Sequence, residues 1–264
     1  MGIYRAPKTS LEILANSINS ALVFVGECAI LFWDILRRLF KRPFEISEIL
    51  NQMAFIGVAS VPIVALTSFS SGAVIALYSA DVLVKYGATN LAGATVGLAV
   101  TREIAPVLAG IMVAARAGSA MAAQIGTMAV TEQIDALRAL NVHPTKYLAI
   151  PRMVAAVVML PILNLIGVYA GVFGGYVIAI TNSRVPHGSF MMSLRQFVEV
   201  SDITGGVYKT IVFGIIVSLV ACQQGMRTKD GAVGVGKATT NTVVITMVMI
   251  YVANFIMTWL LFKK

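Results

Sequence analysis

Apolar residues along this chain gather in five long runs separated by shorter polar segments. A helix needs roughly 20 consecutive apolar residues to cross the hydrocarbon core of a bilayer, and each run is close to that length. The runs cover Met53–Leu77, Leu91–Ala115 (or as far as Ile125), Met153–Thr181, Val207–Cys222 with its flanks, and Val243–Phe262. The pattern predicts five transmembrane helices.

The segment before these runs, Leu11–Lys41, has a different periodicity. At about 100° per residue, nine of its polar residues fall within one sector of a helical wheel about 100° wide, and its other faces are mostly apolar. That sector holds Glu12, Asn16, Asn19, Ser20, Glu27, Asp34, Arg37, Arg38 and Lys41. Such a helix is expected to lie in the membrane interface and to end near Pro43. The alternative is a sixth span, with Glu27 and Asp34 turned toward other helices.

Composition agrees with the pattern. Hydrophobic residues fill 58% of the 264 positions and charged residues 12%, whereas an average soluble domain has about 25% charged residues. So little polar material could not cover a water-soluble surface, so the fold class is all-α integral membrane protein. The net charge of +8 does not indicate nucleic-acid binding, because basic residues flank the apolar runs and form no single stripe. Cys28 and Cys222 are expected to pack in the interior, with no disulfide and no metal site.

The Lys and Arg residues indicate the orientation in the membrane. They cluster before the first span, between the second and third, and between the fourth and fifth, which places these segments in the cytoplasm. The residues are Arg37, Arg38, Lys41, Arg42, Arg138, Lys146, Arg152, Arg227, Lys229 and Lys237. In the opposite loops, Ser79–Asn90 and Asn182–Gly206, basic residues are balanced by Asp81, Glu199 and Asp202.

Two adjacent charged residues, Arg102 and Glu103, lie well inside the second run. A charge at such a place costs about 2.5–3.5 kcal/mol on insertion scales, so it usually serves a function. Neighbouring helical residues point about 100° apart, so each needs a partner elsewhere. Lys209 enters the fourth run from the same outer side and could meet Glu103. These residues form either a buried ion pair that holds helices in register or the polar patch of an amphipathic cavity.

Between the second and third runs, Thr131–Asn141 has the features of a short amphipathic helix. Thr131 is a suitable N-cap, and Glu132 and Asp135 in the first turn complement the helix dipole. Apolar residues recur every third position, and His143 with Pro144 is expected to end the helix. From periodicity, this helix is either a docking element for a partner or an interfacial loop.

Small residues recur every fourth position in two runs, which lets helices approach closely in lipid. One row is Ala114, Gly118, Ala122 and Gly126, and the other is Gly167, Gly171 and Gly175. They indicate either a tight, dimeric permease core or ordinary helix packing.

The segment Gly231–Lys237 has the spacing of a phosphate-binding loop, but Ala238 stands where Ser or Thr should reach magnesium. No apolar strand precedes the segment. The chain is therefore not expected to bind ATP.

These residues resemble those of the MlaE/YrbE family of ABC-transporter permeases. The similarity covers about 67–264 and rests on four stretches. They are Arg102-Glu-Ile-Ala-Pro-Val-Leu-Ala-Gly, Ala115-Arg-Ala-Gly-Ser-Ala-Met-Ala-Ala-Gln-Ile-Gly-Thr-Met, Thr131-Glu-Gln-Ile-Asp-Ala-Leu-Arg-Ala-Leu-Asn-Val-His-Pro and Gly234-Val-Gly-Lys-Ala-Thr-Thr-Asn-Thr-Val-Val. The resemblance divides the chain into an interfacial helix, 1–44, and a permease domain, 45–264.

The resemblance implies a homodimeric permease in the inner membrane of a bacterium or the inner envelope of a plastid. Two cytoplasmic ATPase subunits would bind the ATP and magnesium, and an outer protein with an MCE domain would exchange phospholipid or a related lipid with the permease. The segment Thr131–Asn141 would be the coupling helix in a groove of the ATPase. Its contacts would come from Glu132, Gln133, Asp135, Leu137 and Arg138.

The resemblance also implies an outward-facing lipid pocket. Arg102, Glu103 and Lys209 would be its polar members, and Tyr86, Ile75, Val82 and Leu83 would line it. One departure from the family's usual Ala-Leu-Gln is visible at Ala76-Leu77-Tyr78, which affects the polarity of the upper pocket and therefore the headgroup preference.

Two other functions are compatible with the spans alone. An ion- or proton-coupled transporter could use Glu103 as its titrating group, but such proteins usually contain inverted repeats with broken helices, and no convincing repeat is visible here. A membrane scaffold without transport is the third reading.

Overall fold

The computed structural model describes residues 10–39 and 46–262, and every regular element within these ranges is a helix. The α-helices are α1 (Ser10–Arg38), α2 (Ile46–Ile56), α3 (Val61–Lys85), α4 (Ala92–Ala99), α5 (Ala105–Val113), α6 (Ser119–Val130), α7 (Gln133–Ala139), α8 (Ile150–Thr181), α9 (His187–Phe197), α10 (Val200–Met226) and α11 (Gly231–Phe262). Short π-helical and 3-10 turns join several of them into longer rods.

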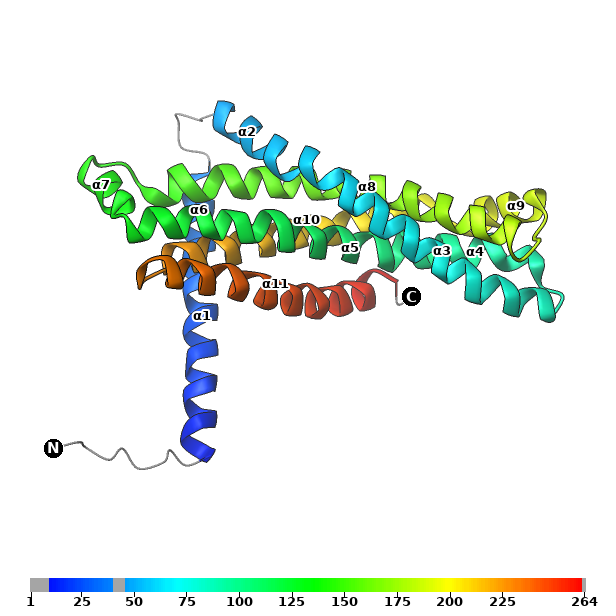
Figure 1. Ribbon diagram of the computed structural model, residues 1–264, viewed down its shortest axis with the longest axis horizontal. Helices are drawn as coiled ribbons and strands as arrows, with labels where there is room; N and C mark the ends of the chain where they lie inside the picture. Colours follow the sequence, from blue (N-terminus) through cyan, green and yellow to red (C-terminus); the bar gives the residue numbers. More distant parts are fainter. Residues whose placement is uncertain (1–9, 40–45, 263–264) are drawn as a thin grey trace.

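In the described part of the chain, five rods are long and apolar enough to cross a membrane. They are Ile46–Lys85, Thr89–Val130, Thr145–Thr181, Val200–Met226 and Gly231–Phe262. The prediction of five spans is confirmed. Each rod exceeds its apolar run, because a helix can continue past the hydrocarbon core into the polar headgroup region. The rods lie side by side along the long axis, with α7 at one end of the bundle and α9 at the other (Figure 1).

The first span is interrupted between α2 and α3. A 3-10 turn, Val58–Ser60, separates the two helices, and Pro62 opens α3. Arg116 bridges the break, since its Nη1 donates to the carbonyl of Phe55 at 3.2 Å and to Ser60 Oγ at 3.4 Å. A cation at the C-terminal, carbonyl end of α2 also interacts favourably with the helix dipole.

The second span contains two π-helical turns, Val100–Ile104 and Ala114–Gly118. The first precedes Pro106, which has no N–H to donate to the carbonyl of Arg102 four residues earlier. π-Turns within α-helices occur often at functional sites. Here the turn contains both Arg102 and Glu103.

Close approach of α3 to α8 depends on glycine. A Cβ on Gly72 would collide with the backbone of Gly171, and one on Gly174 with the backbone of Phe69. A Cβ on Gly167 would lie 3.0 Å from Ser68 Oγ, and one on Gly175 would meet Val96. The row of Gly167, Gly171 and Gly175 therefore packs within this chain, against α3, α4 and the first π-turn.

The other row packs within the chain as well. A Cβ on Gly118 would lie 3.3 Å from Val217 of α10, and one on Gly126 would lie 2.9 Å from Thr228 Oγ1. Both rows thus serve helix packing within this chain, which agrees with the second of the two alternatives, ordinary helix packing.

The loop expected at Asn182–Gly206 contains the helix α9 and the first turns of α10. Asp202, which counted as a loop charge in the sequence, is 1% exposed. Its Oδ2 accepts the backbone N–H of Glu199 at 3.0 Å and completes a capping box at the start of α10. The fourth span therefore begins at Val200, earlier than its apolar run suggested.

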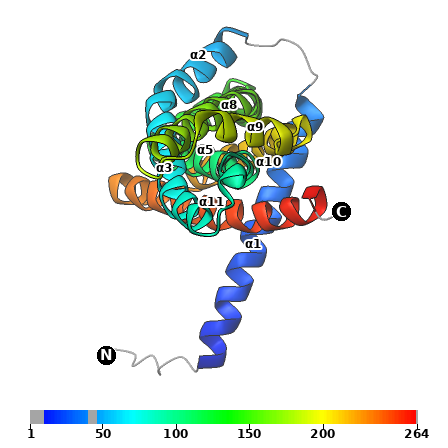
Figure 2. The ribbon, with the colours of Figure 1, turned by 90° about the vertical axis from the view of Figure 1, so that its right-hand side faces the viewer.

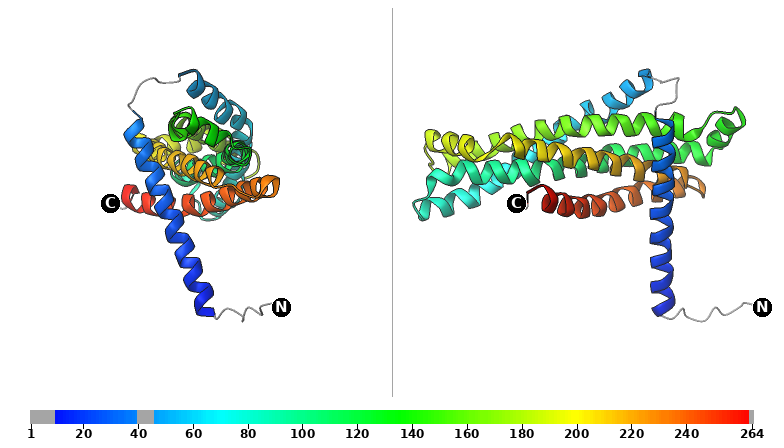
Figure 3. Two further views of the ribbon diagram at one scale, coloured as in Figure 1. Left: turned by 90° about the vertical axis from the view of Figure 1, so that its left-hand side faces the viewer. Right: turned by 180° about the vertical axis from the view of Figure 1, so that it is seen from behind.

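Helix α1 runs across the α7 end of the bundle and not along it (Figures 1 and 3). Viewed along the bundle, it projects from one side (Figure 2). It is not one of the five candidate spans, and this direction agrees with an interfacial helix. The predicted helix end near Pro43, the residues Lys41 and Arg42, and the side chains of Glu12, Asn16 and Ser20 lie outside the described residues.

One face of α1 packs on the bundle, where Cys28, Leu31 and Ile35 join a buried cluster with residues of α6, α7, α8 and α10. The opposite face exposes apolar side chains, among them Ile30 and Trp33. Glu27 faces another helix, as the sixth-span alternative expected, because its Oε2 accepts from Gln223 Nε2 at 2.6 Å and from Arg227 at 3.2 Å. A helix with this arrangement can contact protein on one side and lipid on the other.

Candidate functional site

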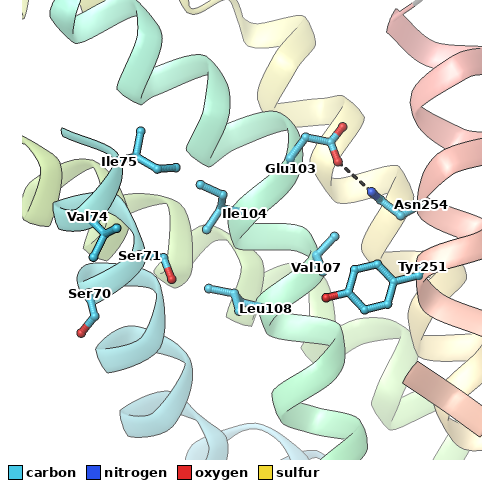
Figure 4. A pocket seen from close by; sticks show the side chains of 10 residues that line it. All are labelled: Ser70, Ser71, Val74, Ile75, Glu103, Ile104, Val107, Leu108, Tyr251 and Asn254. Carbon is cyan, nitrogen blue, oxygen red and sulfur yellow. Dashed lines mark hydrogen bonds between the residues drawn. The ribbon is translucent and has the colours of Figure 1, made fainter. Parts of the chain in front are cut away.

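A cavity of about 560 Å³ lies between α3, the segment from the first π-turn into α5, and α11 (Figure 4). Its lining is mostly apolar, with a few polar groups. The lining residues are Ser70, Ser71, Val74, Ile75, Glu103, Ile104, Val107, Leu108, Tyr251 and Asn254. An apolar cavity with a few placed polar groups is the usual form of a ligand site.

Glu103 is the charged residue of this lining, and three donors hold its carboxylate. Its Oε1 accepts from Lys209 Nζ at 2.9 Å and from Thr258 Oγ1 at 2.8 Å, and its Oε2 accepts from Asn254 Nδ2 at 2.7 Å. The bond from Asn254 crosses the edge of the cavity (Figure 4). The side chain remains 41% exposed, so the carboxylate is fixed in place but reachable from the cavity.

Lys209 supports Glu103 from within the protein, and the predicted contact between the two is present. The Lys209 side chain is 0% exposed, and its ammonium group donates three hydrogen bonds. Besides Glu103, they reach the carbonyl of Arg102 at 2.6 Å and Thr258 Oγ1 at 2.7 Å. The bond to the carbonyl of Arg102 replaces the one that Pro106 cannot make. All three donors of the ammonium are therefore used inside the chain.

Arg102 points to a different partner, as the helix geometry required. Its Nε donates to Asp202 Oδ1 at 2.8 Å, and its guanidinium lies 4.9 Å from the ring centroid of Phe262. Within the described residues, no bond of its Nη1 or Nη2 is recorded, and the side chain is 39% exposed. The guanidinium edge that carries these two atoms is therefore open to an outside anion.

The remaining predicted pocket residues are divided between the cavity and the outer end of α3. Ile75 lines the cavity. Val82 and Tyr86 are exposed near the end of α3, Tyr86 to 84%, while Leu83 packs against a buried core cluster. The structure therefore brings Ile75, Glu103 and Lys209 together, with Arg102 alongside, and places Val82, Leu83 and Tyr86 outside this cavity.

The segment predicted as a coupling helix forms α7, which begins differently from the prediction. Thr131 is not its N-cap, because its hydroxyl donates back to the carbonyl of Thr127 at 2.8 Å at the end of α6. The chain reverses at Glu132, the N-cap, with φ at 60°. The helix also ends before His143, since Asn141 adopts φ of 58° and its N–H bonds to the carbonyl of Arg138.

Helix α7 presents polar residues outward and apolar residues to the bundle. Gln133 is exposed, and Asp135 and Arg138 form an exposed ion pair at 2.8 Å. Ile134 is buried and Leu137 half-buried in the cluster that also holds α1. Leu140, which follows Ile134 and Leu137 in the three-residue spacing, is 74% exposed and offers an apolar contact.

Several polar residues of the site were absent from the sequence prediction. Asn254 and Thr258 lie four residues apart inside the fifth apolar run, so they share a helix face, and this signal could have found them. Tyr251 lies three residues before Asn254. Asp202 gave no such signal, because its burial depends on where α10 begins.

The lookalike of a phosphate-binding loop, Gly231–Lys237, forms the first turns of α11. Its backbone is helical and does not make the open cradle that a phosphate-binding loop provides.

These features define a class: a polytopic membrane protein of five spanning rods with a charged, ligand-sized cavity among them. A family profile described as "Permease MlaE" matches residues 49–260. The chain belongs to the MlaE family of ABC-transporter permeases.

Known relatives are similar in sequence over nearly the whole chain. A probable ABC transporter permease protein of Rickettsia typhi is 43% identical over 239 residues, which are 90% of this chain and 92% of that protein. A protein of the same description from a Synechocystis species is 36% identical over 259 residues, 98% of this chain and 96% of its own. A third, from Pyropia yezoensis, is 32% identical over 233 residues, 88% and 89% of the two chains. This membership favours an ABC permease over an ion-coupled transporter or a scaffold.

Proposed function

We propose that this chain is the membrane-spanning subunit of an ATP-driven transporter that moves phospholipid or a related lipid between the inner membrane of a bacterium and a carrier with an MCE domain. The permease works as a homodimer with two cytoplasmic ATPase subunits, which bind the ATP and magnesium.

The cavity beside Glu103 is the observation that carries the proposal. A lipid needs apolar walls for its acyl chains and polar groups for its head. Val74, Val107 and Leu108 supply such walls, and Glu103 with Asn254 lies at one edge. The unused guanidinium nitrogens of Arg102 suit a phosphate, since a planar guanidinium can donate two parallel hydrogen bonds.

Lys209 enters this proposal as a positioning residue. Its side chain is not exposed and makes three internal bonds. It therefore holds Glu103 and the carbonyl of Arg102 in place, and the residues around it contact the lipid. Val82 and Tyr86, exposed farther along α3, would form the outer rim of the lipid path.

The homodimer is supported by α11, one wall of the cavity. Its outward face is apolar and exposed along its length, with Val244, Val248, Phe255 and Trp259 more than half accessible. A second protomer on this face would close the cavity between two copies. ATP-driven closure of the ATPases would then tilt α7 through Glu132, Gln133, Asp135 and Arg138 and narrow the cavity.

Charge reversal of Glu103 tests the pocket. The complex of permease, ATPase and carrier is reconstituted in liposomes, and ATP-dependent transfer of labelled phospholipid to the carrier is followed. Glu103→Arg should reduce transfer about tenfold or more, because an arginine there faces Lys209, while the ATPase subunits still co-purify. Glu48→Arg, outside the cavity, is the matched control and should transfer lipid normally.

Unchanged lipid transfer by Glu103→Arg would contradict the assignment of this cavity as the lipid pocket. A wild-type complex that hydrolyses ATP but moves no lipid would instead overturn the substrate class. Recovery of the permease from native membranes without any ATPase would contradict the assembly.

A further inference from the structure

A second cavity, of about 480 Å³, lies on another flank of the bundle, between α8, α9 and the start of α10. Buried Val168 and Phe190 belong to its lining, and Tyr169 and Phe173 stand exposed beside them. Tyr169 and Phe173 lie within the candidate span Thr145–Thr181 and are exposed, so the opening of this cavity would face the surrounding lipid.

This cavity is separate from the one at Glu103. Thr101 of the second span lines the new cavity, and Glu103 lines the first. Two positions apart in the first π-turn, these residues point to nearly opposite sides of the span. The two cavities therefore open on different sides of the same span.

Two polar side chains of the lining already bond within the chain. The hydroxyl of Thr101 donates to the carbonyl of Gly97 at 2.8 Å, and the hydroxyl of Tyr176 is hydrogen-bonded to His187 Nδ1 at 2.9 Å. The other lining side chains named above are apolar or aromatic. Such a surface is suited to a hydrocarbon chain and offers little to a polar ligand.

A more polar cavity of about 690 Å³ adjoins the apolar one. It shares His187 and Met191 with it and is also lined by Arg195 and Gln196 of α9. Arg195 is exposed, and the structure records no ion pair or hydrogen bond of its guanidinium with the described residues. Helix α9 lies beside α8 and α4 at the end of the bundle opposite α7 (Figure 1), where headgroups of that leaflet would be.

We propose that these adjoining cavities form a second lipid site, which binds one anionic phospholipid from the surrounding bilayer. An acyl chain lies in the apolar cavity against Val172 and Phe190, and the phosphate lies beside Arg195 and His187. The charge of Arg195 selects an anionic head, and the opening between Tyr169 and Phe173 admits the chain sideways. The site does not depend on the transported substrate, because it is separate from the cavity at Glu103.

Photolabelling of the intact complex tests the site. The probe is phosphatidylglycerol with a diazirine in one acyl chain, in nanodiscs of phosphatidylcholine, and labelled peptides are identified by mass spectrometry. We expect label on 168–176 and 187–198. Val172→Trp, which fills the apolar cavity, should reduce this label about tenfold, and Arg195→Gln should weaken competition by unlabelled phosphatidylglycerol about tenfold. Leu66→Trp, which adds an indole to an exposed position of α3 outside both cavities, is the control and should label as wild type.

Arg195→Gln alters an exposed side chain, so it remains informative if Val172→Trp fails to fold. Equal label in wild type and Val172→Trp, or unchanged competition by unlabelled phosphatidylglycerol in Arg195→Gln, would overturn the proposal. So would label spread evenly over all exposed spans, or a cross-link from these peptides to a second copy or to a partner helix in place of lipid. Transport measured in parallel separates this result from the pocket at Glu103, since Val172→Trp leaves that cavity intact.

Discussion

Helices α10 and α11 follow each other in the chain and are similarly apolar, yet they occupy opposite environments. Of the residues in the most apolar window of each helix, 72% are buried in α10 but only 11% in α11. Helix α10 lies against α5, α6, α8 and α11, and it carries Gly206 and Gly214 at close contacts. Apolar content alone therefore predicts that a helix enters a membrane, whereas small residues and polar contacts decide which helices become central.

The largest effect is expected from adding a side chain to α10. A Cβ on Gly214 would lie 2.9 Å from the carbonyl oxygen of Ala156 on α8. Gly214→Leu should therefore force α8 and α10 apart and prevent recovery of folded protein, measured by size-exclusion chromatography in detergent. Gly236→Leu on α11, where nothing lies within 4 Å of an added Cβ, should elute normally. A normal profile for Gly214→Leu would show that the contact can relax.

Lys209 of α10 donates a hydrogen bond to Thr258 of α11, and its removal should have the next largest effect. Lys209→Met leaves the Glu103 carboxylate and the Arg102 carbonyl without the ammonium, and should destabilise the protein by about 3–5 kcal/mol. Thermal denaturation in detergent measures the loss. Adding Glu103→Gln should recover part of it, because the unpaired charge is then removed. If the double variant is no more stable than Lys209→Met, the ion pair is not the main contribution.

The same polar substitution on α10 and on α11 should show the difference between the two helices with a smaller loss of stability. Val217 of α10 is fully buried and Val248 of α11 is exposed. Val217→Gln should cost about 2 kcal/mol or more, because it buries an amide without a partner. Val248→Gln should change monomer stability by less than about 0.5 kcal/mol but lower the dimer fraction in mass photometry. An unchanged dimer fraction would place the protomer contact elsewhere.

The smallest effect concerns the two cysteines, one on α10 and one on the peripheral α1. Burial, together with the charge of Glu27, raises the pKa of the Cys28 thiol to about 11, so maleimide should label it slowly at neutral pH and faster as pH rises. Glu27→Gln removes that charge and weakens the bonds from Gln223 and Arg227, so labelling should increase severalfold. Cys222, at 1% exposure, should stay unlabelled. Rapid labelling of Cys28 in the wild type would contradict the packed position of α1.

The spans were predictable because their signal is the average of some twenty residues, and the contact of Lys209 with Glu103 followed from their shared depth in neighbouring spans. Helix α9 was missed because its eleven residues mix apolar and polar side chains in a segment without a long apolar run. The N-cap at Thr131 was wrong because the hydroxyl bonds within α6, and sequence alone does not say which of two adjoining helices a threonine serves. The positions of Val82, Leu83 and Tyr86 outside the cavity depend on tertiary packing.

Pro106 has a consequence for how the protein is made. The second span is synthesised about one hundred residues before Lys209, and chains fold from the N-terminus as they emerge. Until α10 arrives, the carbonyl of Arg102 lacks the donor that Lys209 later provides, in a bilayer that offers no water in its place. The second span would therefore enter the membrane with one carbonyl lacking its final donor, and we expect quality-control proteases to recognise chains truncated before residue 209.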